Sequence, residues 1–380
     1  MTKNRIADEA LKAHKKLKGK ISVEPKAALR SKRDLNIFYT PGVAAVSSYV
    51  ATHPTEAGDY TTKGNTVAVV SDGSAVLGLG NIGPLGALPV MEGKAMIFKA
   101  MAGIDAFPIV LSTQDTEEII KTVINIAPGF GGINLEDISA PRCFEIEKRL
   151  REKLDIPVFH DDQHGTAMVV LAGLINALKV VKKSASKVRV VISGSGAAGQ
   201  AIAQMILAHG VGDLIVLDSQ GIISKNRKDL DSHKKALLKL TNKRGVSGGL
   251  NEAIRQSDVF IGVSKPGLLT KAHVTSMNPK AIIFALSNPV PEIMPAEAKR
   301  AGAAVIATGR SDFPNQLNNS LGFPGIFRGA LDNHVQTITP KMLVQAAHNL
   351  AALVKKPTSA YIIPDMFDRR VVKAVARAIK

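Results

Sequence analysis

Two pairs of adjacent acids are the clearest candidates for metal chemistry in this chain. Glu136-Asp137 and Asp161-Asp162 each follow a short stretch that is typical of a β-strand. Because ligands bind beyond the carboxyl ends of parallel strands, we expect the two pairs to converge there. Carboxylate oxygens suit a hard ion such as Mg²⁺ or Mn²⁺, which would also relieve the repulsion between the acids. Taken alone, the pairs are explained equally well as solvated turns.

Neutral polar side chains lie beside these acids and after other predicted strands. His160 and His164 flank the second pair, but zinc prefers nitrogen and sulfur ligands and no thiol is close in sequence. We therefore expect both histidines to support the site or to begin a helix. Asn288, Asn318 and Asn319 offer amides that can bind a carboxylate without adding charge. A turn-forming role is the simpler interpretation of these asparagines.

Two residues are candidates for proton transfer. Lys94 is predicted to begin a helix after a glycine-rich stretch. At that end of a helix the macrodipole disfavours a positive charge, which would lower the lysine pKa towards that of a general base. Tyr39 precedes a Pro-Gly turn, and its phenol could act as a general acid. Without further context, packing is the commoner role of such a tyrosine.

Two segments have the glycine spacing of a dinucleotide-binding turn, Gly-x-Gly-x-x-Gly. The second consists of Gly194, Ser195, Gly196, Ala197, Ala198 and Gly199. A β-branched stretch at 188–192 precedes it, a predicted helix at 200–209 follows, and the next strand ends on Asp218. Strand, glycine turn, helix and terminal acid together predict a pyrophosphate and ribose site. The alternative is the same local structure without a ligand.

The first segment, residues 78–83, is less suited to a phosphate. Pro84, Gly86 and Pro89 occupy the stretch where a helix should begin, and these residues disfavour helix formation. We therefore predict that residues 78–86 form a compact loop beside Lys94.

Alternating elements must position these residues. Strand-like segments alternate with helical patterns up to about residue 160 and again from residue 188. The alternation predicts an α/β protein with two domains. Residues 1–163 would form a parallel-sheet catalytic and metal domain, and residues 164–380 a Rossmann dinucleotide-binding domain with a helical C-terminal tail.

Composition narrows the class of protein. The chain of 380 residues carries a net charge of +17, but aromatic residues make up only 4% and tryptophan is absent, which argues against a nucleic-acid-binding surface. No uninterrupted apolar run reaches the length of a membrane span. The basic N-terminus lacks the apolar core of a secretion signal, and we expect an amphipathic surface helix at 5–16. With one cysteine, Cys143, a cytoplasmic location is expected.

Seven segments together resemble the malic enzymes, in their short bacterial form. They lie at 38–44, 71–95, 134–138, 159–167, 193–199, 284–289 and 318–332, and they include FYTPGVA, SDGSAVLGLGNIG and FHDDQHGTA. Their order is that of the family, and they cover nearly the whole chain. The resemblance implies oxidative decarboxylation of L-malate to pyruvate and carbon dioxide, with NAD or NADP as cofactor and Mg²⁺ or Mn²⁺ at the site.

The resemblance also implies roles for single residues. Lys94 would take the hydroxyl proton of malate, with Asp161 tuning it, and Tyr39 would protonate the enol of pyruvate. The implied metal ligands are Glu136, Asp137 and Asp162. The implied substrate contacts are Lys94, Asn288, Asn318 and Asn319, of which Asn288 would also contact the cofactor.

Three points stay open. Ala75 stands where longer malic enzymes carry an arginine for the substrate carboxylate, and Ser74 and the backbone amides of residues 78–83 are candidates to replace it. Asp218 favours NAD because a carboxylate repels a 2′-phosphate, whereas Lys225 and Arg227 could bind that phosphate in NADP. The family suggests a homodimer, in which the Tyr39 segment could be shared between subunits.

Two other functions remain as alternatives. Another two-domain NAD(P) enzyme, such as an amino-acid dehydrogenase, would also place a lysine beside a cofactor domain but would not need the carboxylate cluster. A non-catalytic dinucleotide-binding sensor would need neither the carboxylates nor Lys94.

Overall fold

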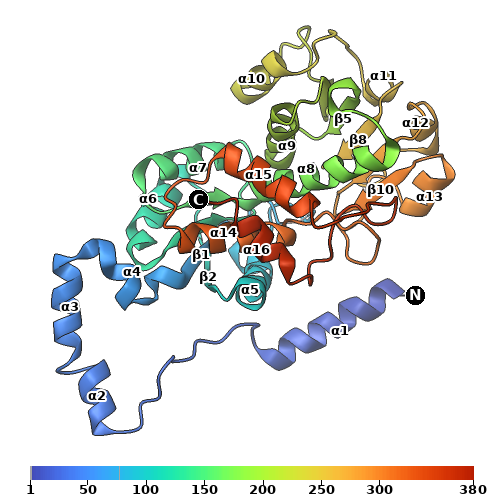
Figure 1. Ribbon diagram of the computed structural model, residues 1–380. Helices are drawn as coiled ribbons and strands as arrows, with labels where there is room; N and C mark the ends of the chain where they lie inside the picture. The colour runs from blue at the N-terminus through green and yellow to red at the C-terminus, as the bar shows by residue number, and fades with distance from the viewer. Residues whose placement is uncertain (1, 77) are drawn as a thin grey trace.

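The computed structural model describes residues 2–76 and 78–380, and it contains two sheets flanked by helices (Figure 1). The first sheet is parallel throughout, in the order β2-β1-β3-β4. Its strands are β1 (Thr66–Ser71), β2 (Asp105–Val110), β3 (Gly132–Leu135) and β4 (Val158–His160). The helices that connect them are α5 (Gly83–Ala102), α6 (Thr116–Ile126) and α7 (Arg142–Lys153).

The second sheet has the order β10-β9-β8-β5-β6-β7, and only its edge strand β7 runs antiparallel. Its strands are β5 (Arg189–Ser193), β6 (Asp213–Asp218), β7 (Gly221–Ile222), β8 (Val259–Gly262), β9 (Ile282–Ala285) and β10 (Val305–Thr308). Its helices are α9 (Ala197–Ala208), α10 (Ser232–Leu240), α11 (Leu250–Ile254), α12 (Lys271–Thr275) and α13 (Pro295–Arg300). The α/β class with two parallel-stranded sheets is therefore confirmed.

Helix α8 (Asp161–Val181) leads from β4 towards the second sheet and packs against α9. It is apolar on all sides, as expected of a helix buried in a core. By length and composition it could cross a membrane, contrary to the expectation from the sequence, but 78% of its most apolar window is buried inside the protein. The domain boundary proposed after residue 163 falls in the first turn of this helix and stays a prediction.

The C-terminal helices return to the first sheet. They are α14 (Phe323–Asp332), α15 (Pro340–Ala351) and α16 (Arg370–Ala376). Phe323 and Phe327 of α14 lie with their ring centroids 4.6 and 5.4 Å from that of Phe98 in α5. This aromatic contact fixes the loop before α14, which carries Asn318 and Asn319, beside the helix that carries Lys94.

The start of α5 differs from the prediction. The helix begins at Gly83 and continues through Pro84, Gly86 and Pro89, so the predicted loop at 78–86 is too long. Pro84 lies in the first turn, where the missing N–H would have had no helical partner. Pro89 is accommodated inside the helix.

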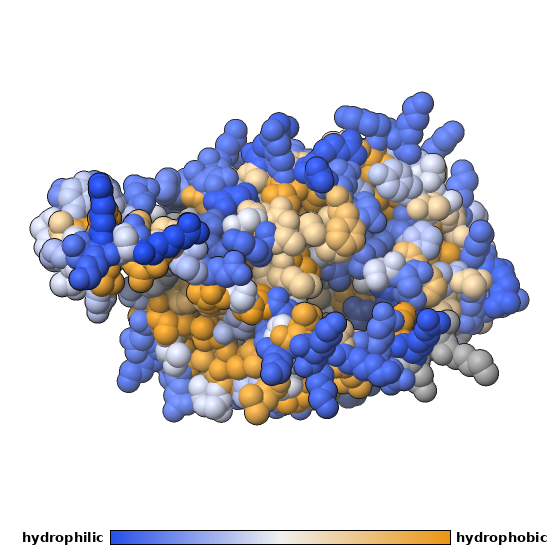
Figure 2. Space-filling model, turned by 90° about the horizontal axis from the view of Figure 1, so that it is seen from below, coloured by the Kyte–Doolittle hydropathy of each residue, from blue (hydrophilic) through white to orange (hydrophobic). Residues whose placement is uncertain are grey.

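The N-terminal region forms an arm that extends away from both sheets (Figure 1). It contains α1 (Thr2–Leu17), α2 (Lys32–Phe38), α3 (Val43–Thr52) and α4 (Ala57–Tyr60). No residue of α2 or α3 is buried. Large apolar side chains of the arm are exposed, including Leu35, Ile37 and Phe38. Seen from the side of α1, the molecule also shows a broad apolar area (Figure 2).

Candidate active site at the junction of the two sheets

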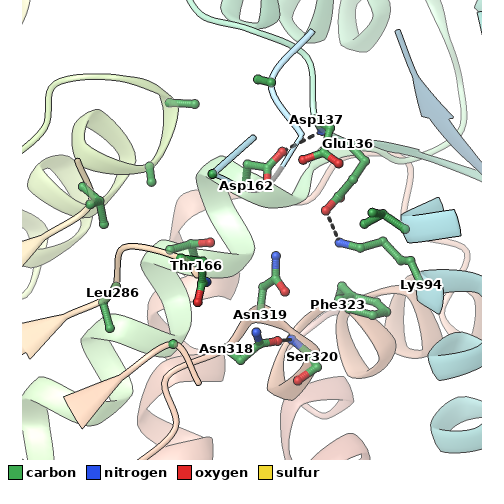
Figure 3. A pocket seen from close by; sticks show the side chains of 18 of the residues that line it. Lys94, Glu136, Asp137, Asp162, Thr166, Leu286, Asn318, Asn319, Ser320 and Phe323 are labelled. Carbon is green, nitrogen blue, oxygen red and sulfur yellow. Dashed lines mark hydrogen bonds and ion pairs between the residues drawn. The ribbon is translucent and has the colours of Figure 1, made fainter. Parts of the chain in front are cut away.

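A pocket of about 870 Å³ lies between segments that follow strands of both sheets. Residues after β3 and at the start of α8 line one side, and residues after β8, β9 and β10 line the other. Figure 3 shows Lys94, Glu136, Asp137 and Asp162 on one wall, with Asn318 and Asn319 opposite. The structure thus brings together most of the residues singled out from the sequence.

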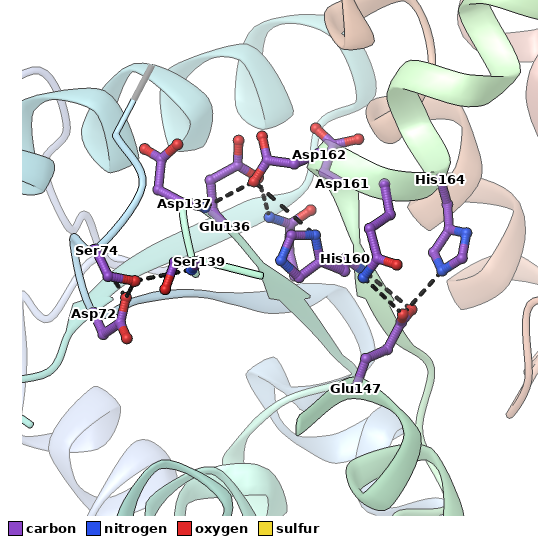
Figure 4. Close-up of polar contacts among 12 residues, drawn as sticks. Asp72, Ser74, Glu136, Asp137, Ser139, Glu147, His160, Asp161, Asp162 and His164 are labelled. Atoms are coloured by element: carbon purple, nitrogen blue, oxygen red, sulfur yellow. Dashed lines mark hydrogen bonds and ion pairs between the residues drawn. The ribbon is translucent and has the colours of Figure 1, made fainter. Parts of the chain in front are cut away.

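Glu136, Asp137 and Asp162 form one carboxylate cluster. One oxygen of each lies within 4.8 Å of the other two, and the backbone N–H of Asp137 donates to Asp162 Oδ2 at 2.8 Å (Figure 4). Burial and the charge of Asp162 raise the pKa of Glu136 well above its usual value. Three oxygen donors that repel one another when ionised fit a hard divalent cation.

Lys94 lies next to this cluster, in the interior of α5. Its Nζ is 2.6 Å from Glu136 Oε1, donates to Asp161 Oδ2, and lies 4.4 Å from the centroid of the Phe323 ring. Only 6% of the Lys94 side chain is exposed, and none of that of Asp161. The two carboxylates therefore hold the ammonium in place without help from solvent.

The predicted reason for a lowered Lys94 pKa is wrong. Lys94 is in the middle of its helix, so the helix N-terminus does not act on it. Burial lowers its pKa, but the charges of Asp161 and Glu136 outweigh burial and raise the pKa above the usual value. Burial raises the pKa of Asp161 to about 6, against the opposing effect of Lys94. A cation on the carboxylate cluster would add positive charge beside Lys94 and disfavour its protonated form.

Behind the carboxylate cluster, Glu147 of α7 holds the start of α8. Its carboxylate accepts from the backbone N–H of His160 at 3.2 Å and from Gln163 Nε2 at 3.2 Å, and it lies 2.9 Å from His164 Nε2 (Figure 4). His164 thus contacts Glu147 through its ring, whereas His160 does so through its backbone and stands at the N-cap of α8. Sequence reasoning missed Glu147, although its position offered a signal. It shares the buried face of α7 with Cys143, Ile146 and Leu150, where an acid needs a partner.

A second missed acid, Glu292, supports the opposite wall. It is fully buried and accepts from the backbone N–H groups of Ser264 at 3.2 Å and Ser287 at 3.0 Å. Those serines lie in the loops after β8 and β9, next to Asn288. Asn288, Asn318 and Asn319 all line the pocket, and Asn318 Oδ1 also accepts from the N–H of Ser320 at 2.9 Å.

The second glycine segment forms the predicted strand, turn and helix. β5 ends at Ser193, and α9 begins at Ala197, inside the segment. A second pocket of about 850 Å³ extends from this turn to Asp218. Gly196, Val263 and Ser264 line both pockets. A ligand with two ends, such as a dinucleotide, fits this arrangement.

Asp218 lines this second pocket and is already ion-paired, so its role in binding the ribose stays a prediction. Arg227 donates to its two carboxylate oxygens at 2.6 and 3.0 Å, and Lys234 Nζ donates at 2.8 Å. Burial works against ionisation, but these hydrogen bonds outweigh it and lower the Asp218 pKa to about 2. Arg227 is thus occupied by Asp218 and Asp229, and Lys225 is not among the described residues that line this pocket.

Two candidates lie outside the pocket. Tyr39 ends α2 in the arm, is 65% exposed, and is not among the described residues lining the pocket. The Ser74 hydroxyl donates to Asp72 Oδ1 at 2.6 Å and accepts from the N–H of Ser139 at 2.9 Å. The one proton that its hydroxyl could donate to a substrate carboxylate is therefore already given to Asp72.

Comparisons with known proteins agree with this geometry. Residues 18–151 match the model of the malic enzyme N-terminal domain, and residues 163–380 match that of the malic enzyme NAD-binding domain. A bifunctional malic/malolactic enzyme of Bacillus subtilis is 52% identical, over 98% of this chain and 92% of its own length. An NADP-dependent malic enzyme of Halomonas elongata is 45% identical, over 97% of this chain and 92% of its own.

A solved structure agrees as well. The NAD-dependent malic enzyme of Thermotoga maritima is 49% identical and superposes with a TM-score of 0.95, over 98% of each chain. These matches favour neither an amino-acid dehydrogenase nor a sensor without catalysis. Sequence, fold and the carboxylate cluster beside a buried lysine lead to one conclusion: the chain belongs to the malic enzyme family.

Proposed function

We propose that the pocket around Lys94 is where this malic enzyme converts L-malate into pyruvate and carbon dioxide while it reduces NAD or NADP. The observation that supports the proposal most directly is the buried Lys94 ammonium, which pairs with Asp161 and with Glu136, itself a member of the carboxylate cluster. The pocket also adjoins the glycine turn through Gly196. The buried state of Cys143 is compatible with a cytoplasmic location, which we also propose.

In the proposed reaction, the carboxylate cluster binds the metal ion, and Lys94 and Asp161 transfer protons. Glu136, Asp137 and Asp162 hold the divalent ion. When bound, that ion supplies a Lewis acid for the C2 oxygen of malate, and the nicotinamide supplies a hydride acceptor. Lys94 first gives its ammonium proton to Asp161, to which it is hydrogen-bonded, and then takes the hydroxyl proton as a neutral amine.

The remaining proton transfer needs Tyr39, which gives a proton to C3 after carbon dioxide has left. Tyr39 and most of its arm are exposed, whereas Lys94 is buried in α5. We therefore propose a homodimer in which the arm of one subunit brings Tyr39 to the pocket of the other. The exposed apolar side chains of the arm, such as Ile37 and Phe38, would be covered in such a dimer.

The activity is tested by incubating the purified protein with L-malate, Mn²⁺ and either NAD or NADP, and by measuring pyruvate and the reduced cofactor. We expect equal amounts of both products, loss of activity with EDTA, and recovery when Mn²⁺ is added back. Reduction of cofactor without pyruvate, or full activity in EDTA, would contradict the proposal. Comparing kcat/KM for NAD and NADP identifies the preferred cofactor.

The shared site is tested by mixing two inactive variants, Lys94→Ala and Tyr39→Ala, after dissociation and reassembly. In a mixed dimer, one pocket combines the intact Lys94 of one chain with the intact Tyr39 of the other. We expect recovery of about a quarter of the wild-type activity if subunits mix at random. A mixture that forms dimers but stays inactive would place Tyr39 and Lys94 of the same chain together.

A further inference from the structure

Lys20 is the one part of the arm that reaches the pocket among the described residues that line it. It follows Gly19, whose φ of +116° favours glycine. The Lys20 N–H donates to Glu92 Oε2 at 3.2 Å, and its Nζ donates to the Pro89 carbonyl at 2.5 Å. Two contacts with α5 thus hold the Lys20 ammonium at the edge of the pocket.

The charges around the pocket single out this lysine. Lys94 is already paired with Glu136 and Asp161. In the described part of the chain, Lys20 Nζ has no carboxylate within ion-pair distance, and its hydrogen bond goes to a neutral carbonyl. Burial lowers the Lys20 pKa, against the opposing charge of Glu92. A half-buried ammonium without a carboxylate partner can attract an anion more strongly than a fully solvated one.

The proposed substrate brings two carboxylates into a pocket that is already rich in acids. The carboxylate on C1 keeps its charge throughout the reaction, whereas the one on C4 loses its charge as carbon dioxide leaves. A cation on the C4 group would therefore stabilise malate more than the transition state and slow the reaction. A fixed cation serves the reaction better at C1.

We propose that Lys20 binds the C1 carboxylate of malate, the group that remains in pyruvate. This assignment rests on the proposed function and adds to it the residue that neutralises the substrate. Ser74, the side chain expected from the sequence, has its hydroxyl committed to Asp72 and Ser139. Lys20 also lies in the arm, so substrate binding would tie the start of the arm to α5.

The test compares Lys20→Met with wild-type enzyme in the presence of Mn²⁺ and NAD. Methionine keeps much of the length of the side chain and removes its charge. We expect the KM for malate to rise about 10- to 100-fold, as for the loss of a hydrogen bond to a charged group. Because the contact persists through the reaction, kcat and the KM for NAD should change little. Calorimetric titration with pyruvate should show a matching rise in Kd.

Two controls separate binding from folding. Lys16→Met removes an exposed lysine from the same arm and should leave both constants unchanged, whereas Lys20→Arg should restore most of the affinity. Thermal unfolding checks that each variant is folded. An unchanged KM for malate in Lys20→Met, or a higher KM without weaker pyruvate binding, overturns the assignment. Wild-type enzyme that makes no pyruvate from malate would instead contradict the proposed function.

Discussion

The two glycine segments share a spacing but differ in what faces their glycines. In the second, a Cβ on Gly199 would lie 1.8 Å from the carbonyl oxygen of Gly194, whereas a Cβ on Gly196 would have nothing within 4 Å among the described atoms. In the first, a Cβ on Gly78 would lie 1.9 Å from the carbonyl oxygen of Asn288. In the second segment, the glycines pack closely against each other but leave space at Gly196. The first segment packs against the loop after β9, which carries Asn288.

The same glycine spacing therefore does not by itself indicate a ligand, because Gly78 and Gly199 are required by nearby backbone and Gly196 is not. A helix follows both segments, since α5 begins at Gly83 and α9 at Ala197, so the helix does not distinguish them. Gly196 leaves room on the side that faces both pockets, as a backbone that approaches a pyrophosphate must. Gly78 instead lets the segment before Lys94 touch the Asn288 loop. We therefore propose that the first segment borders the reacting groups and that the second holds the cofactor.

We expect the largest loss of activity from a substitution at Lys94, next to the first glycine segment. Replacing Lys94 by alanine removes the proposed base, and we expect kcat to fall about 100- to 10,000-fold. The cofactor turn lies on other elements, so the Kd for NADH, measured by fluorescence titration, should stay close to that of the wild type. Turnover equal to wild type would remove Lys94 from the mechanism.

Lys99→Ala is the matched control for this variant. Lys99 lies on the same helix, but its side chain is 64% exposed and pairs with Asp105 at the surface. We expect kcat within about twofold of wild type, because exposed ion pairs contribute little. A loss of turnover in both variants would point to damage to α5 and not to loss of a base.

A smaller effect is expected on the cofactor side. Gly199→Ala places a methyl group against the backbone of Gly194, and we expect a loss of about 1–3 kcal/mol in the free energy of unfolding, together with weaker NADH binding. Gly196 has a φ of −75° and open space around it. The free energy of unfolding of Gly196→Ala should therefore differ from that of the wild type by no more than about 0.5 kcal/mol. The substitution should still weaken cofactor binding, because the methyl group would occupy the space proposed for the pyrophosphate. Normal NADH binding in Gly196→Ala would contradict the proposal that the second segment binds the pyrophosphate and the first does not.

The features that could be predicted from the sequence are those set by residues close together in the chain, and those that meet at the carboxyl edge of a parallel sheet. β5, the glycine turn and α9 are local, and the acids after β3 and β4 converge because those strands are adjacent in the sheet. The predicted start of α5 is wrong because Pro84 is a first-turn residue and does not break the helix. Arg227 and Lys234 reach Asp218, and Ser264 reaches Glu292, only because of how the intervening loops fold back, so propensity and spacing did not predict these pairs. The distance between Tyr39 and Lys94 depends on how the arm leaves the sheets.

The smallest effect should come from the far end of the cofactor pocket. Lys234 donates to Asp218, and its positive charge lies near the proposed ribose. In Lys234→Gln the charge is lost, so a 2′-phosphate is attracted less and the Asp218 carboxylate is less neutralised. We expect kcat/KM for NADP to fall about three- to tenfold, equivalent to about 1 kcal/mol, and that for NAD to change less. Lys235→Gln, exposed on the same helix, should leave the ratio of the two constants unaltered. If Lys234→Gln also leaves that ratio unaltered, Asp218 and its partners do not select the cofactor, and selection must lie elsewhere in the second pocket.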